Sequence, residues 1–291
     1  MLITECPRDA MQGLPYFVPT EVKVSYHRAL LKVGFPVIDI GSFVSPTAIP
    51  QLADSGAVLH SLLPHKGTTR FLVIVGNERG ALQSTAHPAV DILGYPWSIS
   101  STFLAKNLHT DLASSRNWIL RLRDLCRETG KEAQVYISMA FGNPYGEDWS
   151  RQMLIDAVSE LQEAGIRRIS LSDTVAMSRP EDISGVFYAL KAHAAHIGFH
   201  LHTRPDQGID RVHAAWEAGC RSFDSVLNGL GGCPMTGHAL VGNLNTLNLL
   251  AYCKEHDIPT GLDPEALREA ASLAGSLLGR GYPLPLSRPQ G

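Results

Sequence analysis

Eight short apolar, β-rich runs recur along the 291-residue chain, and amphipathic stretches lie between them. We predict strands at 2–6, 37–41, 71–76, 89–95, 133–140, 167–173, 198–203 and 222–228. We predict helices at intervening positions that include 20–33, 113–129, 150–164, 180–195 and 207–218. Regular alternation of strand and helix is typical of a parallel sheet with right-handed crossovers, and eight such units indicate an α/β protein with a closed (β/α)8 TIM barrel. An open doubly wound sheet is the alternative, although no GxGxxG follows the first predicted strand.

One domain is expected to occupy residues 1–291, with the barrel at about 2–228. A cysteine-containing loop and extra C-terminal helices are expected at about 229–280, with helical segments at 243–256 and 263–279. Glycine in a left-handed conformation commonly ends a helix. On this basis we predict helix C-caps at Gly165, at Gly198 and in the AGC sequence at 218–220.

Bulk properties exclude several classes of protein. The formal net charge of −3 gives no reason to expect nucleic acid or an anionic membrane as partner. No apolar stretch approaches the roughly 20 residues of a membrane span, and the N-terminus lacks a basic-then-apolar signal. An odd number of scattered cysteines without a CxxC pair argues against a disulfide framework and against a thiolate zinc site. These cysteines are Cys6, Cys126, Cys220, Cys233 and Cys253. We therefore expect a soluble protein in the cytoplasm.

Chemically capable side chains collect where the predicted strands end, which is where TIM barrels carry their active sites. They are Arg8 and Asp9 after the first strand, Asp39 in the second, Asp173 and Thr174 after the sixth, and His200 and His202 in the seventh. Asp173 and Thr174 could equally form a turn before the next helix.

His200 and His202 are the most informative pair, because residues i and i+2 of a strand point to the same side. Two imidazoles with a carboxylate such as Asp9 make a mixed nitrogen and oxygen site that suits a divalent cation. The alternative is one hydrogen-bonded core histidine and one solvent-facing histidine. Asp9 could also be a helix N-cap or a partner of Arg8, whose planar donors suit an oxyanion.

The sequence NGLGGCPMTG at 228–237 places four glycines around Cys233 and a proline directly after it. Glycine is used where the backbone needs a positive φ or approaches another group closely. Cys233 is therefore either a structural thiol in a loose turn or a reactive group that the loop delivers.

Six motifs occur together in order: ECPRDAMQ (5–12), GSFVSP (41–46), ISLSDT (169–174), FHLHT (199–203), GLGGCP (229–234) and VGNLNT (241–246). In these motifs the chain resembles the 3-hydroxy-3-methylglutaryl-CoA lyase family, over residues 2 to about 256. The cysteine loop is the most specific of them, since it separates these lyases from the related synthases.

The resemblance implies a divalent cation, Mg²⁺ or Mn²⁺, held by Asp9, His200, His202 and Asn243. It implies that Arg8 neutralises the enolate oxygen, that His200 acts as base, and that Cys233 on a closing loop takes part in proton transfer. It also places Asp39 among the catalytic residues. Substrate binding is assigned to Gln12, Ser42, Asp173 and Thr174.

The implied reaction is metal-assisted retro-Claisen cleavage of 3-hydroxy-3-methylglutaryl-CoA to acetyl-CoA and acetoacetate, as in leucine degradation and ketone-body formation. The implied partner is an acyl-CoA substrate, and a homo-oligomer, most simply a dimer, is expected. Alternatives are a lyase for another 3-hydroxyacyl-CoA such as citramalyl-CoA, an acyl-CoA-dependent synthase, or a non-catalytic binding protein. The chain departs from the family pattern at Ala10, Asp39, Asn143, Thr203 and Leu247, which is compatible with a divergent lyase acting on a related substrate.

Overall fold

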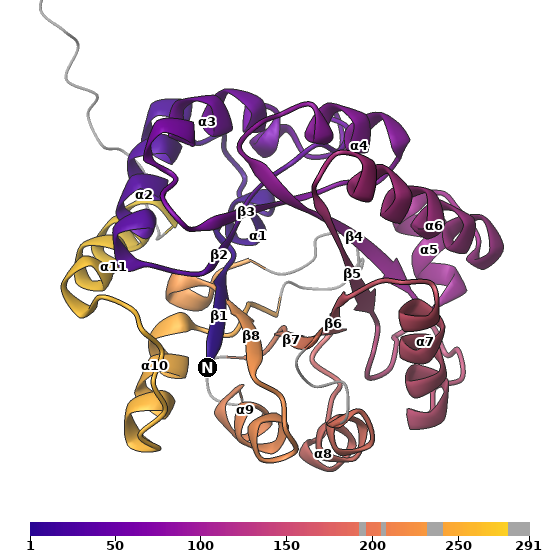
Figure 1. Ribbon diagram of the computed structural model, residues 1–291. Coiled ribbons are helices and arrows are strands. Elements are labelled where there is room, and N and C mark those ends of the chain that lie inside the picture. The colour runs from indigo at the N-terminus through magenta and orange to yellow at the C-terminus, as the bar shows by residue number, and fades with distance from the viewer. Residues whose placement is uncertain (192–195, 205–207, 232–240, 279–291) are drawn as a thin grey trace, which may run out of the picture.

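A computed structural model describes residues 1–191, 196–204, 208–231 and 241–278. Eight parallel strands form a closed barrel in sequence order (Figure 1). They are β1 (Leu2–Glu5), β2 (Val37–Ser42), β3 (Arg70–Ile74), β4 (Val90–Ser98), β5 (Glu132–Ser138), β6 (Arg168–Asp173), β7 (Ile197–Leu201) and β8 (Ser222–Ser225). The barrel closes where β1 pairs with β8, from Leu2 opposite Ser222 to Glu5 opposite Ser225. The predicted TIM barrel is thus confirmed.

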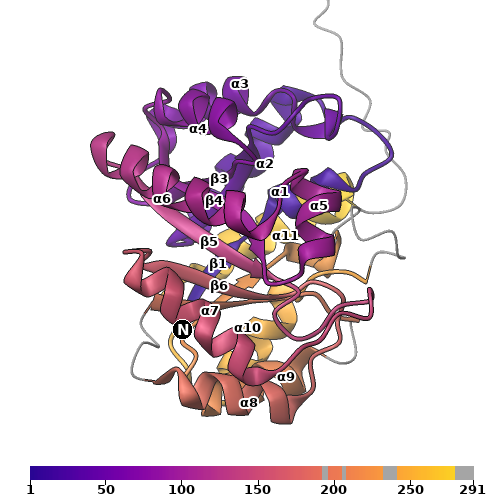
Figure 2. The same ribbon diagram turned by 90° about the vertical axis from the view of Figure 1, so that its right-hand side faces the viewer.

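Helices surround the barrel in both views (Figures 1 and 2). They are α1 (Pro7–Gln12), α2 (Thr20–Val33), α3 (Ser55–Leu62), α4 (Glu78–Thr85), α5 (Ser101–Leu108), α6 (Leu112–Glu128), α7 (Arg151–Glu163), α8 (Pro180–Ala189), α9 (Gly208–Glu217), α10 (Thr246–Glu255) and α11 (Pro264–Leu278). Short 3-10 turns are η1 (Pro50–Leu52), η2 (Leu63–His65) and η4 (Leu227–Gly229). The two predicted C-terminal helices correspond to α10 and α11. The helix predicted at 180–195 ends as α8 at Ala189, and residues 192–195 lie outside the described part.

Two of the three predicted helix C-caps are correct. Gly165 and Gly219 follow α7 and α9 with φ of 83° and 107°, and their amides donate to the carbonyls of Gln162 and Trp216. The prediction at Gly198 is wrong, because this residue is the second of β7. A Cβ added there would lie 3.4 Å from the Ser222 Oγ of β8, which is an ordinary contact distance.

The predicted strand at 222–228 is also too long. β8 ends at Ser225 and gives way to η4, in which Asn228 has φ of 68°. Glu5 of β1 reaches this turn, since its carboxyl group accepts from the Leu227 amide at 2.8 Å and from the Thr246 hydroxyl at 2.7 Å. Burial raises the pKa of Glu5 to about 8, which favours the neutral carboxyl group at pH 7.

The inside of the barrel is divided between two kinds of side chain. One cluster is apolar and comes from β2 to β5: Val37, Leu72, Ile74, Ile92 and Tyr136. Buried polar side chains form a second group on β1 and β6 to β8, which includes Thr4, Ser170, Ser172, His200 and Asp224, and β2 and β5 add Asp39 and Gln134. The larger apolar core lies between the barrel and its helices, and includes Phe71, Phe199 and Phe223.

Within the described ranges, no helix has the length and apolar character needed to cross a bilayer. Four of the five cysteines are described, and each is a buried free thiol: Cys6, Cys126, Cys220 and Cys253.

Candidate active site

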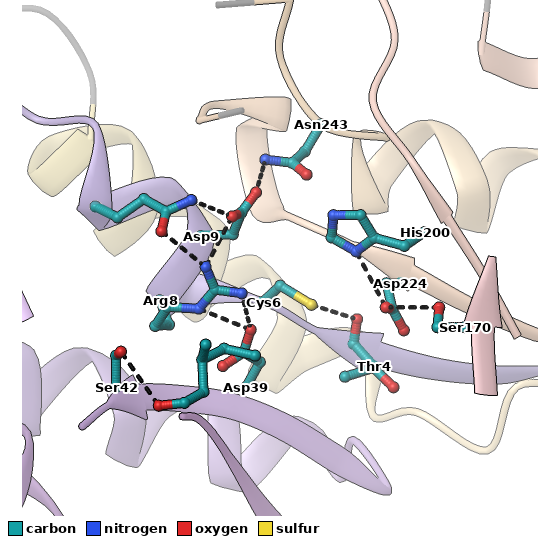
Figure 3. A network of polar contacts seen from close by, with 12 residues as sticks. Thr4, Cys6, Arg8, Asp9, Asp39, Ser42, Ser170, His200, Asp224 and Asn243 are labelled. Carbon is teal, nitrogen blue, oxygen red and sulfur yellow. Dashed lines mark hydrogen bonds and ion pairs between the residues drawn. The ribbon is translucent and has the colours of Figure 1, made fainter. Parts of the chain in front are cut away.

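The candidate site lies at the carboxyl end of the barrel, and chain order explains how its first residues reach it. β1 ends at Glu5, and α1 starts at Pro7, a residue whose fixed φ suits the first turn of a helix. Arg8 and Asp9 therefore sit in the first turn of α1, buried directly beyond the end of β1 (Figure 3).

His200 and His202 approach each other at the end of β7, as their i, i+2 spacing predicts. Their Nε2 atoms are 3.0 Å apart. The other ring nitrogens are both anchored to acceptors: His200 Nδ1 lies 3.1 Å from Asp224 Oδ2, and His202 Nδ1 lies 2.8 Å from the Thr174 carbonyl. Because a carboxylate and a carbonyl accept, each Nδ1 carries a proton, and each neutral ring presents an Nε2 lone pair to the other.

The third member of this group is Asp9, whose Oδ2 lies 3.6 Å from His202 Nε2. Burial would raise the pKa of Asp9, but the Arg8 guanidinium and His202 outweigh burial and lower it. The carboxyl group is therefore ionised. Ligand atoms of Asp9, His200 and His202 all lie within 4.8 Å of one another. Two imidazole lone pairs and a carboxylate suit a divalent cation, so Asp9, His200 and His202 form a candidate metal site.

The electrostatics of His200 bear on metal binding. Burial lowers its pKa, but the hydrogen bond and the charge of Asp224 outweigh burial and raise it. A proton on His200 Nε2 can then bridge the 3.0 Å gap to His202. A cation and this proton are alternatives at one position, and metal binding should release a proton.

Asn243 lies beside Asp9, as the predicted ligand set requires. Its Nδ2 donates to Asp9 Oδ2 at 2.7 Å and to the Leu230 carbonyl at 2.9 Å (Figure 3). The amide nitrogen, rather than the oxygen, faces Asp9 in this arrangement. Ligation by Oδ1 would require the amide to turn over, because nitrogen bearing two hydrogens offers no lone pair for a cation.

Arg8 is held between two carboxylates. Its Nε and Nη2 donate to Asp39 Oδ2 at 2.9 and 2.5 Å, and its Nη1 donates to Asp9 Oδ1 at 2.9 Å. Gln12 completes the group, since its Oε1 accepts from Arg8 Nη1 at 2.9 Å. Burial raises the pKa of Asp39 to about 6 against the opposing effect of Arg8. Asp39 thus fixes the plane of the guanidinium, and its Oδ1 has no hydrogen-bond partner among the described residues.

A cavity of about 180 Å³ opens beside these groups. Its lining includes the predicted site residues Arg8, Asp9, Gln12, Ser42, Thr174, His200 and His202. Asp173 does not line this cavity. Its carboxylate accepts from the backbone amides of Met177 and Ser178, at 2.9 and 3.0 Å, and from the Ser178 hydroxyl. Asp173 thereby shapes the turn that follows β6.

Cys233 lies outside the described residues, but the loop that leads to it is described as far as Gly231. Gly229 and Gly231 have φ of 63° and 105°. A Cβ on Gly231 would lie 2.7 Å from the Asp9 carbonyl oxygen and 2.8 Å from Asn243 Nδ2. Both reasons for glycine, positive φ and close approach, are therefore met where the loop packs on the candidate metal ligands.

The structure also identifies site residues that strand-end reasoning missed. Asp224 anchors His200, while Tyr136, Ser138 and Ser172 line the cavity. In the predicted strand 222–228, Asp224 lies two residues from Ser222, and this alternation is the sequence feature that could have indicated an inward side chain. In the structure, Asp224 lies opposite His200 in the sheet. Cys6 lies near His200 and Asp224, but burial raises the pKa of this thiol well above its usual range, which keeps it neutral.

Three of the positions that depart from the family pattern, Thr203, Asn143 and Leu247, do not line the cavity. Thr203 is buried, and its hydroxyl donates to the Arg204 carbonyl at 2.9 Å. Asn143 Oδ1 accepts from the amides of Tyr145 and Glu147, so Asn143 organises its own loop. Leu247 is exposed on α10.

Comparison with known proteins gives matches over nearly the whole chain. A family model described as HMGL-like matches residues 2–274. The hydroxymethylglutaryl-CoA lyase YngG of Bacillus subtilis is 30% identical over 281 residues, which cover 96% of this chain and 92% of that protein. The (R)-citramalyl-CoA lyase of Chloroflexus aurantiacus is 30% identical over 295 residues, which cover 98% and 92%. A solved HMG-CoA lyase from Acinetobacter baumannii, in complex with coenzyme A and 3-methylmalate, has a TM-score of 0.86 at 31% identity, with 98% of this chain and 93% of that chain covered.

Proposed function

This chain belongs to the HMGL-like family, and from that premise we propose that it is a carbon–carbon lyase that cleaves 3-hydroxy-3-methylglutaryl-CoA to acetyl-CoA and acetoacetate. The observation that carries the proposal is the convergence of two Nε2 lone pairs and the Asp9 carboxylate at one end of the cavity. That donor set suits Mg²⁺ or Mn²⁺, and the solved relative in complex with coenzyme A supports an acyl-CoA substrate.

The reaction removes the proton of the C3 hydroxyl and leaves the electron pair of the broken C2–C3 bond on the thioester enolate. When bound, a divalent cation supplies Lewis-acid stabilisation of negative charge on substrate oxygens. Arg8 stabilises the enolate oxygen with donors that Asp39 and Asp9 hold in place. We assign Cys233 the proton transfer to the enolate carbon, because an unperturbed thiol has a pKa of about 8.5 and can donate a proton near pH 7.

His200 takes the hydroxyl proton in this scheme. Its Nε2 cannot carry that proton and ligate a cation at the same time. We therefore assign His200 the proton when substrate is bound; toward a cation in the substrate-free site, Asp9, His200 and His202 would all be ligands. Asp224, at 3.1 Å from His200 Nδ1, neutralises the imidazolium that forms.

Citramalyl-CoA is the second candidate substrate, because the Chloroflexus aurantiacus (R)-citramalyl-CoA lyase matches this chain at the same 30% identity. We also propose a cytoplasmic location, which the described free thiols support, and a homodimer, which size-exclusion chromatography with light scattering would test.

The proposed function is tested by acetyl-CoA release from each candidate substrate with Mg²⁺ or Mn²⁺, and after chelation. Arg8→Lys should lower kcat by roughly 100-fold or more, because an ammonium cannot replace the donors that reach Asp39, Asp9 and Gln12 together. Cys233→Ser should also slow cleavage strongly, since a hydroxyl is a much weaker acid than a thiol.

Cys126→Ala is the matched control, because Cys126 is a buried thiol of α6 and does not line the cavity. It should keep the parent kcat. Metal-independent turnover, or full activity in Arg8→Lys and Cys233→Ser, would overturn the proposed mechanism.

A further inference from the structure

Among the described residues that line the candidate site cavity, the ionisable side chains lie together at one end. At that end lie Arg8, Asp9, His200 and His202. An apolar part of the lining comes from the β2–α3 connection, the end of β3, and α5. We call it the alkyl wall, and its side chains are Val44, Ile49, Ile74, Phe103 and Leu108. Phe103 is buried, whereas Val44 and Leu108 are half-buried and face the open space.

Charge is absent from the alkyl wall. Among the described residues that line the cavity, Arg8 is the only lysine or arginine, and it is already paired with Asp9 and Asp39. Asn107 contributes an amide from α5: its Nδ2 donates to the Phe103 carbonyl at 2.9 Å, and its buried Oδ1, which can only accept, has no hydrogen-bond partner among the described residues. A carboxylate placed against this wall would lose its hydration without finding a cation, whereas an aliphatic group would gain from burial.

Gly76, directly beyond β3, keeps space open within the alkyl wall. A Cβ added there would lie 3.6 Å from Val44 Cγ1 and 3.8 Å from Leu108 Cδ2, which are ordinary contact distances. Its φ is not in the left-handed region, so the backbone does not demand glycine. Gly94 of β4 is the opposite case, because a Cβ there would lie only 2.7 Å from Ile74 Cδ1. An alanine would therefore fit at position 76. The glycine leaves space there that neither packing nor backbone conformation requires.

We propose that the alkyl wall binds the substituent on C3 of the substrate, and that the enzyme prefers 3-hydroxy-3-alkylglutaryl-CoA thioesters whose alkyl group is longer than methyl. The inference rests on the proposed function and narrows it. Hydroxyl, carbonyl and carboxylate oxygens of the substrate take the polar end, and the alkyl group takes the space beside Gly76. The products are acetyl-CoA and the matching 3-oxo acid. Each methylene buried against the wall should raise kcat/KM by about fourfold.

The test compares kcat/KM for three thioesters that carry methyl, propyl or pentyl on C3. The parent protein should favour propyl or pentyl over methyl by about tenfold or more, which corresponds to two or more buried methylenes. Gly76→Ala adds a methyl group to the wall and should lower the pentyl-to-methyl ratio by about tenfold. Leu108→Ala enlarges the same space and should raise that ratio.

Gly56→Ala is the matched control. Gly56 lies in α3, nothing lies within 4 Å of an added Cβ, and the residue does not line this cavity. This variant should keep the parent ratios and gain helix stability.

The outcomes separate the two proposals. Cleavage of all three thioesters with methyl preferred would overturn the inference and leave the proposed function standing. An equal loss on all three in Gly76→Ala would place the common coenzyme A arm at the wall, and would also overturn it. No cleavage of any thioester with Mg²⁺ or Mn²⁺, by a folded protein, would contradict the proposed function itself.

Discussion

The two sides of the barrel interior are built on opposite principles. On the apolar side, Val37, Leu72, Ile74 and Ile92 of β2 to β4 pack together and present no polar side-chain atom. On the polar side, Thr4, Ser170, His200 and Asp224 come from β1 and β6 to β8. Burial of alkyl groups stabilises the fold on the first side, whereas buried polar groups on the second cost free energy unless each finds a partner.

The comparison shows which side is specialised for chemistry. On the polar side, Asp224 and the Thr174 carbonyl orient the imidazoles of His200 and His202 by accepting hydrogen bonds from their Nδ1 atoms. Tyr136 lies at the boundary, because it belongs to the apolar cluster while its ring stands edge-on to His200 at 5.7 Å and 83°. Its hydroxyl has no hydrogen-bond partner among the described residues. Substitutions on each side should therefore separate stability from metal binding.

The largest effect is expected on the apolar side. Leu72→Ala removes a fully buried side chain and should lower the free energy of unfolding by about 2–5 kcal/mol, measured by denaturant titration. Mn²⁺ affinity of the folded protein should stay at the parent value. Leu82→Ala is the control, because Leu82 is 52% exposed on α4, and it should change stability by less than about 0.5 kcal/mol. Equal losses in the two variants would contradict the assigned role of the cluster.

Asp224→Asn should change metal binding rather than stability. Loss of the carboxylate releases His200 Nδ1, and an amide nitrogen at this position favours the ring form that carries its proton on Nε2. Mn²⁺ affinity should fall by about 10- to 100-fold in isothermal titration calorimetry.

Ser170→Ala controls for the neighbourhood of Asp224, because its hydroxyl lies at 3.5 Å from Oδ2 and forms at most a weak hydrogen bond. It should leave Mn²⁺ affinity nearly unchanged. Parent affinity in Asp224→Asn would show that His200 needs no anchor.

Tyr136→Phe should give the smallest effect. Removing a buried hydroxyl that has no protein partner leaves no other group unsatisfied, so stability should stay within about 1 kcal/mol of the parent or rise slightly. Thermal unfolding measures this change. A loss well above 1 kcal/mol would mean that the hydroxyl is bonded, through water for example, and that Tyr136 belongs to the polar side.

The sequence predicted the barrel well because strands buried on both faces stand out as short apolar runs between amphipathic helices. The named helix predictions left out α1, α3, α4 and α5, which have six to eight residues, because one or two turns carry too little periodicity. The sequence brought Arg8, Asp9, His200 and His202 together because all stand at strand ends. Asp224 escaped the same reasoning, because it lies within β8 and its place opposite His200 depends on the register with β7. Asp173 also stands at a strand end, but its carboxylate accepts hydrogen bonds from backbone amides of the following turn and does not line the cavity.

The barrel can close only after most of the chain has been synthesised. β1 pairs with β8, and α11 packs against α2, so early segments find their partners only near the end of the chain (Figure 1). At ribosomal rates of 5–20 residues per second, the stretch from Leu2 to Ser222 takes on the order of 10 to 40 seconds to make. Throughout that interval the free edge of β1 and the apolar face of α2 remain open to wrong partners. The barrel therefore cannot close until β8 and α11 have been synthesised.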